Sequence, residues 1–85
     1  MAETKALACV HGCESKAGGA VLITFDASFS DKINLPNLII EIDRTKSTTQ
    51  LNNAVRQAAM NAINADTPST ISSLNDIFLA GGFVN

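Results

Sequence analysis

The stretch AVLITFD at residues 20–26 sets the architecture of the chain, because it carries the strongest strand pattern in the sequence. Val21, Ile23 and Phe25 occupy alternate positions in it, and a period of two directs successive side chains to opposite faces of a strand. β-Branched and aromatic residues are also enriched in strands. The pattern therefore predicts a strand over 20–26 with one apolar face directed at a core.

The segment before it, residues 5–13, predicts a partner strand. The connecting ESKAGG contains Gly18 and Gly19, which can adopt positive φ without a steric penalty. Two strands joined by such a turn favour an antiparallel hairpin. A short helix is the rival interpretation of the first segment, because ALACV is apolar on both phases of the strand period.

A third strand is predicted over residues 38–43. The connector before it, ASFSDKINLPN, contains Pro36, which disfavours helix at the residue that precedes it. Leu38, Ile40 and Ile42 share one face of this strand. The other face is mostly polar and includes Glu41 and Asp43, which we interpret as a solvated face rather than a cation site. This pattern is typical of an antiparallel sheet covered on one side.

The period changes to that of a helix after Ser47. Ser47 and Gln50 have the spacing of a capping box, and Thr48 or Thr49 is the alternative cap. We predict a helix over 48–64, whose apolar positions recur at three- and four-residue intervals: Leu51, Ala54, Val55, Ala58, Ala59, Ala62 and Ile63.

The C-terminal segment predicts a second, shorter helix over 70–80. Its apolar residues have helical spacing, and Gly81 stands at the position of a C-terminal glycine cap. An extended tail is expected over 81–85. Together these elements predict one small α+β domain over residues 1–85, with a three-stranded, mainly antiparallel sheet and two helices packed on it.

Composition narrows the class of protein. Charged residues make up only 16% of the 85 residues, and six basic against eight acidic side chains give a net charge of −2. Phosphate binding needs clustered cations, so we expect no nucleic-acid partner. The apolar runs are shorter than the roughly 20 residues of a membrane helix, and the N-terminus lacks the pattern of a signal peptide. We therefore expect no membrane partner, and a location in the cytoplasm or in a virion.

Cys9, His11 and Cys13 are the only cysteines and the only histidine of the chain. Two thiolates and an imidazole are ligands that zinc prefers. On a straight strand, however, same-face neighbours lie roughly 6.5–7 Å apart, so the three can share an ion only if the strand bends at Gly12. A fourth ligand would have to come from elsewhere, for instance Asp26 or a second subunit.

Three other interpretations of this cluster remain open. The thiols can be small buried hydrophobes with a hydrogen-bonded histidine beside them. A Cys9–Cys13 disulfide needs a turn, because the Cα atoms of a bridge lie within about 7 Å. A Cys–His dyad for nucleophilic catalysis needs the imidazole beside the sulfur and a third group to orient it.

Contact with other proteins is the function that these features favour. An uncharged polar surface suits such contact, and the candidate contact residues are Leu22, Ile39, Phe83 and Val84. We expect a non-enzymatic structural or assembly protein without a cofactor, homo-oligomeric or part of a larger assembly, such as a capsid decoration or tail-associated component of a phage virion. The alternatives are a zinc-binding module that uses Cys9, His11 and Cys13, and a small inhibitor or regulator of another protein.

Overall fold

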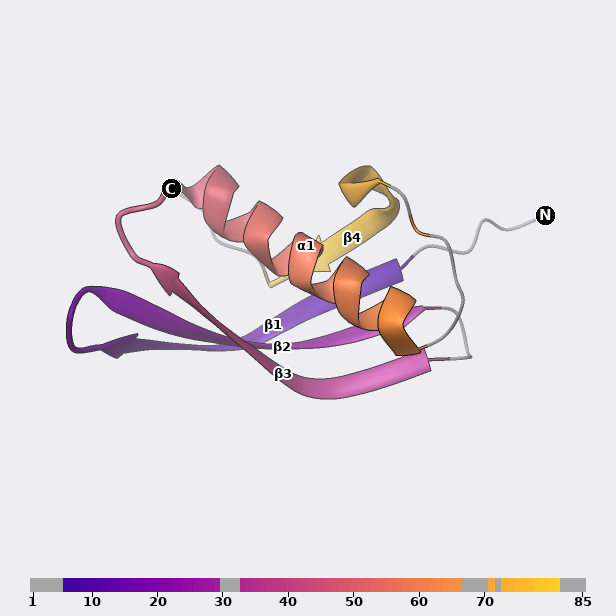
Figure 1. Ribbon diagram of the computed structural model, residues 1–85, viewed down its shortest axis with the longest axis horizontal. Coiled ribbons are helices and arrows are strands. Elements are labelled where there is room, and N and C mark those ends of the chain that lie inside the picture. The colour runs from indigo at the N-terminus through magenta and orange to yellow at the C-terminus, as the bar shows by residue number, and fades with distance from the viewer. Residues whose placement is uncertain (1–5, 30–32, 67–70, 72, 82–85) are drawn as a thin grey trace.

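One long helix lies across one face of a four-stranded sheet in the computed structural model of the chain (Figure 1). The structure describes residues 6–29, 33–66, 71 and 73–81. The strand order is β3-β2-β1-β4. The elements are β1 (Ala6–Lys16), β2 (Ala20–Phe29), β3 (Ile33–Asp43), α1 (Thr48–Asp66), the short 3₁₀ helix η1 (Leu74–Asp76) and β4 (Ile77–Ala80).

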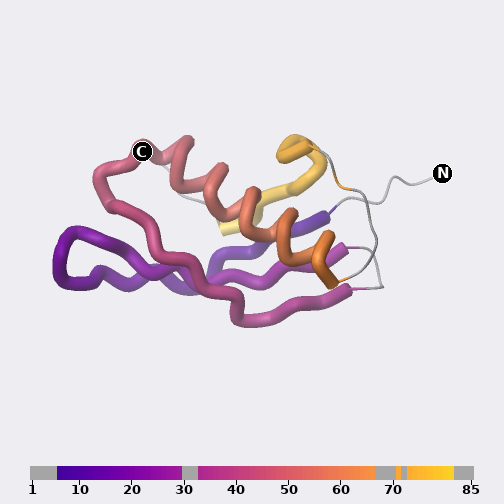
Figure 2. The backbone as a smooth tube through the Cα atoms, viewed as in Figure 1, coloured from indigo at the N-terminus to yellow at the C-terminus, as the bar shows by residue number. Residues whose placement is uncertain are grey.

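The predicted hairpin forms the centre of the sheet. β1 and β2 pair antiparallel from Ala6 opposite Phe29 to Lys16 opposite Ala20. Gly18 and Gly19 turn the chain with φ of 89° and 85°, a conformation that costs a glycine little. The trace in Figure 2 shows this hairpin extending well beyond the helix at one end of the molecule.

The third strand is longer than the sequence predicted. Ala27 pairs with Leu35 and Phe29 with Ile33, so most of the predicted connector belongs to β2 and β3. Residues 30–32 lie outside the described part. Pro36 is compatible with β3 because this strand is at the edge of the sheet, where a missing N–H removes no ladder hydrogen bond. A bulge opposite the Phe25–Ala27 stretch accommodates it.

Helix α1 begins with the predicted capping box. The Ser47 N–H donates to the Gln50 side chain at 3.0 Å, and the Gln50 N–H donates to the Ser47 hydroxyl at 3.2 Å. The buried helix residues are Val55, Ala59 and Ile63, which meet the predicted apolar face of β2. The core of the described residues contains no polar side chain and consists of Ala6, Ala8, Val21, Ile23, Phe25, Ala27, Ile33, Val55, Ala59, Ile63, Ile71 and Ile77.

The predicted C-terminal helix is wrong, and so is the three-stranded sheet. Among the described residues of this segment, only Leu74–Asp76 is helical, as a 3₁₀ turn capped by the Ser73 hydroxyl. Ile77–Ala80 then forms β4, a fourth strand parallel to β1. The sheet is therefore mixed. Ile77 is buried and the next residue, Phe78, is exposed, an alternation of strand type that is too short to outweigh the helical spacing upstream.

Gly81 ends β4 rather than a helix. Its φ is 71°, and a Cβ built on it would lie 2.5 Å from the carbonyl oxygen of Val10. A glycine is required here by this close approach to β1 as well as by the positive φ. Residues 82–85 of the predicted tail, like residues 67–70 at the start of the predicted second helix, lie outside the described residues.

Candidate interaction surface on the open sheet face

The sheet face opposite α1 is covered by no element of the described part of the chain, and we call it the open face. The three exposed large hydrophobic residues among the described positions are Leu7 at 37%, Ile39 at 61% and Phe78 at 64% exposed. Each of them lies between neighbours that are buried or packed against the core. Because side chains alternate along a strand, all three therefore belong to the open face.

Leu7 and Phe78 form one apolar corner of the open face. They are direct partners in the parallel β1–β4 ladder, and side chains paired in this way lie in contact range. The sequence prediction missed both residues. Leu7 lies in a segment whose odd and even positions are both apolar, so the pattern does not indicate which face Leu7 occupies. Phe78 has the spacing of a helical face, which predicted a helix instead of a strand. The corner therefore depends on the β4 strand that the sequence pattern did not indicate.

A bulge in β1 separates the three metal-ligand candidates. The register shifts between Val10 and Gly12, which makes His11 the extra residue. Cys9 pairs with Asp26 on the open face, whereas Cys13 pairs with the buried Ile23 and so belongs to the helix side of the sheet. Both cysteines are free thiols. In the described part of the chain, no three His, Cys, Asp or Glu side chains are placed to hold a metal ion.

The bulge turns His11 onto the open face, where it meets a carboxylate. The His11 Nε2 lies 3.0 Å from Oδ1 of Asp26. The same oxygen accepts the backbone N–H of Asn37 at 2.8 Å. Asn37 is in the β3 bulge and has a φ of 58°, a left-handed conformation that asparagine tolerates better than most residues. The Asp26 carboxylate thus holds together the bulges of both neighbouring strands.

These contacts lower the pKa of Asp26. The main cause is the Asn37 N–H; partial burial opposes it, and the hydrogen bond and charge of His11 add to the lowering. The carboxylate therefore stays ionised and fixes the imidazole. Within the described structure, His11 bonds to Asp26, and no hydrogen bond joins it to the Cys9 thiol. Asp26, His11 and the Asn37 N–H together form a polar centre within the open face.

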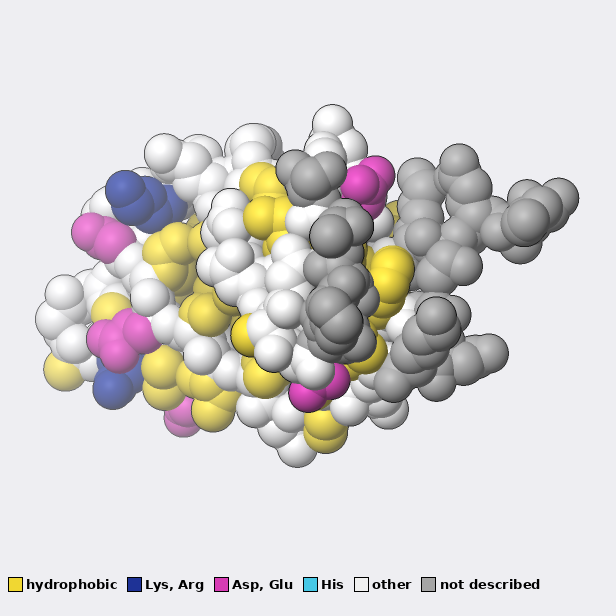
Figure 3. Space-filling view, turned by 45° about the vertical axis from the view of Figure 1, so that its right-hand side comes forward, with side chains coloured by type: hydrophobic (Ala, Val, Ile, Leu, Met, Phe, Trp, Pro, Cys, Tyr) yellow, Lys and Arg dark blue, Asp and Glu magenta, His cyan; other side chains and the backbone are white. Residues whose placement is uncertain are grey.

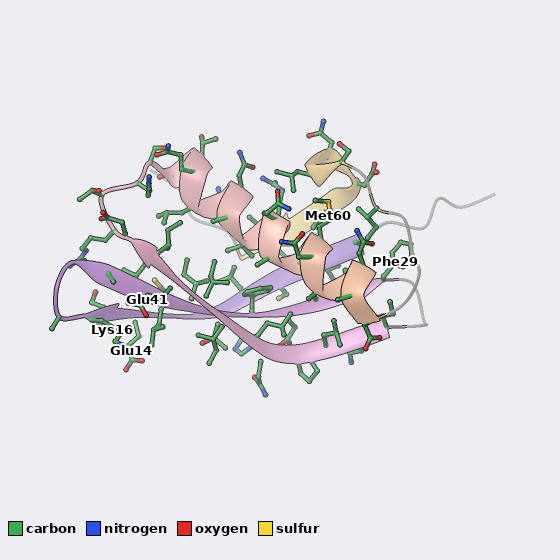
Figure 4. All side chains as sticks on the ribbon, viewed as in Figure 1. Glu14, Lys16, Phe29, Glu41 and Met60 are labelled. Atoms are coloured by element: carbon green, nitrogen blue, oxygen red, sulfur yellow. The ribbon has the colours of Figure 1, made fainter. Side chains whose placement is uncertain are left out.

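The structure places Leu22 and Ile39 of the predicted contact residues on this face. Leu22 pairs with Glu41 and Ile39 with Thr24, which makes the two apolar residues diagonal neighbours. Glu14 pairs with Leu22 from the other side, so two glutamates flank Leu22. Figure 4 shows Glu14, Lys16 and Glu41 gathered at the hairpin end of the sheet, far from Met60. Phe83 and Val84 lie outside the described residues.

Figure 3 shows most of the charged side chains in that view at the hairpin end of the molecule, and apolar side chains between uncharged polar ones over its middle. Among the described helices, none is long and apolar enough to cross a membrane. No family model, curated protein or solved structure matches the chain, so its function is inferred from the residues described above.

Proposed function

We propose that the protein is a non-enzymatic assembly protein that packs through its open face onto a second copy of itself. The observation that carries this proposal is the distribution of exposed apolar residues. Leu7, Ile39 and Phe78, at 37–64% exposure, all lie on the single face that no described element covers. They form two apolar contact sites on this face, the Leu7–Phe78 pair and Ile39 with its diagonal neighbour Leu22. The His11–Asp26 pair lies between the two sites.

The charges of the open face support a second copy as the partner. The face carries both signs of charge, with Lys16 one row beyond Glu14 and Glu41. A surface with both signs can be complementary to itself across a two-fold axis.

The composition extends the proposal to a subunit of a larger particle, such as a phage virion. Its support is the low charge of the chain, 16% of residues, against about 25% in typical domains. A particle subunit that is surrounded by protein needs fewer charges for solubility than a free monomer does.

Sedimentation velocity tests the proposal directly. We expect the wild-type protein to form dimers or larger species at high micromolar concentration, and Ile39→Lys to shift it toward monomer by placing a charge within the interface. Gln57→Lys is the matched control, because Gln57 is exposed on α1. A wild-type chain that remains monomeric throughout, or equal behaviour of the two variants, would overturn the proposal.

A zinc-binding module is the second candidate, and the separation of Cys9 from Cys13 by the bulge disfavours it. We expect protein purified without an affinity tag to contain less than about a tenth of an equivalent of zinc. An equivalent of zinc bound through the two cysteines would favour this alternative, with ligands drawn from two chains.

A further inference from the structure

A groove runs beside β4 at the edge of the sheet. Its lining comes from three elements: Arg56 from α1, Asn75 from η1, and Ile77 and Phe78 from β4. β4 is the last strand in the sheet order, so its outer side has no neighbouring strand in the described part of the chain. The groove therefore combines a cation, an amide, an exposed aromatic ring and the open side of a strand.

Arg56 reaches the groove with much of its hydrogen-bonding capacity unused. Its Nε donates to the carbonyl of Ile77 at 3.3 Å, and Nη1 donates to the side-chain oxygen of Asn53 at 3.1 Å. A guanidinium has five N–H donors, and both of these acceptors are neutral. The one ion pair among the described residues joins His11 to Asp26. The half-buried Arg56 therefore forms no ion pair with a described carboxylate. These contacts also hold the guanidinium in place beside the strand.

The backbone of β4 offers further hydrogen bonds along the same groove. The Ile77 N–H donates to Leu74 and the Ile77 carbonyl accepts from Arg56, so the backbone groups of Ile77 point away from β1. Groups two residues apart in a strand project to the same side. The N–H and carbonyl of Leu79 therefore project toward the open edge, where an extended chain can pair with them.

We infer that this groove binds an extended segment of a partner protein that presents a glutamate or aspartate side chain to Arg56. The planar guanidinium fits a carboxylate through two parallel hydrogen bonds. Leu79 pairs with the backbone of the segment, and the exposed ring of Phe78 packs against an apolar neighbour of the acidic residue. The inference rests on the proposed function in one respect, namely that the segment belongs to another protein of the same assembly.

An amide NMR titration tests this site with two probe peptides, acetyl-Thr-Val-Glu-Val-Thr-amide and the same peptide with glutamine at the centre. We expect the glutamate peptide to shift the amide signals of residues 75–80 and to bind at least tenfold more tightly than the glutamine peptide. Arg56→Gln should abolish that difference, and Arg56→Lys should retain part of it. Arg44→Gln, which removes an arginine outside the groove, should leave the difference unchanged.

Three outcomes would overturn the inference. The two peptides could bind equally, or neither could shift residues 75–80. The glutamine peptide with a free C-terminal carboxylate could bind as tightly as the glutamate peptide, which would assign the site to chain ends instead. Ile39→Lys separates this test from that of the proposed function, because it should disrupt self-association and, by leaving Phe78 free, bind the glutamate peptide at least as tightly as the wild type does.

Discussion

The two faces of the sheet are built from the same strands and differ in what lies against them. On the helix side, Ile23 and Phe25 pack with Val55 and Ile63, all 0–1% exposed. On the open face, Ile39 has the same side chain as Ile23 and is 61% exposed. The same strand alternation that builds a core on one face thus leaves apolar anchors on the other. Burial in this sheet is therefore set by the placement of α1, not by the strand sequences alone.

The largest difference in stability is expected between two variants that carry the same change, isoleucine to alanine, on opposite faces of the sheet. Ile23→Ala removes a fully buried side chain and should lower the free energy of unfolding by about 2–5 kcal/mol. Ile39→Ala should change it by less than about 0.5 kcal/mol, since exposed sites contribute little. Urea unfolding followed by circular dichroism measures both, under conditions where the protein is monomeric. If Ile23→Ala does not fold, Ile23→Val, with an expected loss of about 0.5–1.5 kcal/mol, replaces it.

Equal losses at the two isoleucines would contradict this difference between the faces. They would mean that the open face is buried in the folded monomer by part of the chain that the structure does not describe. A loss at Ile39 that grows with protein concentration would instead support its burial between copies.

The second prediction tests β4, on which the apolar corner of the open face depends. Gly81→Ala forces a left-handed conformation that costs about 1–2 kcal/mol for a non-glycine residue, and its Cβ would also meet the Val10 carbonyl. Gly18→Ala is the matched control, since Gly18 has a φ of 89° and a Cβ at that position would have no atom within 4 Å. Thermal unfolding should show a larger loss for Gly81→Ala; equal losses would argue against the contact between β4 and β1.

The third prediction concerns the helix that covers the core face. Ser47→Ala removes the hydroxyl that accepts the Gln50 N–H, and loss of such a cap costs about 1 kcal/mol. Thr49→Ala, at an exposed position of the first turn, should cost less than about 0.5 kcal/mol. Urea unfolding of both variants distinguishes the cap from its neighbours. A larger loss for Thr49→Ala would place the cap two residues later.

The smallest effect on stability is expected at Asp26, in the polar centre of the open face. Because the folded-state pKa of Asp26 is lowered, the carboxylate contributes stability that is fully present above the unfolded value of about 3.9 and is lost as pH falls through the folded value. Asp26→Asn should therefore flatten the stability profile below about pH 4. The main cause of the lowered pKa is a backbone hydrogen bond, so added salt should leave most of the effect in place.

Asp43 provides a comparison for this measurement. Its pKa is also lowered, mainly by the Thr45 N–H and then by the Thr45 hydroxyl, both bonded to the same Asp43 oxygen. We expect Asp43→Asn to flatten the same part of the profile independently. A profile of Asp26→Asn identical to that of the wild type below pH 4 would show that the hydrogen bonds from Asn37 and His11 add no stability.

Elements that carry a repeated sequence pattern could be predicted from the sequence, whereas features that depend on the pairing between strands could not. The alternation around Ile23, the paired glycines and the Ser47–Gln50 spacing predicted the hairpin and the start of α1 correctly. The β1 bulge depends on the register between two strands, which single residues do not reveal. Without that register, a straight strand places Cys13 on the same face as Cys9, and nothing in the sequence indicates the pairing of His11 with Asp26.

The error at the C-terminus has a similar physical origin. Leu74, Ile77 and Phe78 have the spacing of a helical face, and only four residues form the strand. Their conformation is set by pairing with the edge of β1, where Ala6 to Cys9 lie in register with Ile77 to Ala80. Tertiary pairing therefore outweighs the local pattern here, and for the same reason the sequence prediction missed the corner formed by Leu7 and Phe78.

The most direct test of the open face as a contact surface is amide NMR recorded as the protein is diluted from about 1 mM to 10 μM. We expect the signals of residues 7, 22, 24, 39 and 78 to shift together with concentration, whereas those of Gln57 and Asn61 on the exposed side of α1 remain fixed. Shifts concentrated on α1, or a spectrum unchanged over the whole range, would contradict the assignment of the open face as the contact surface.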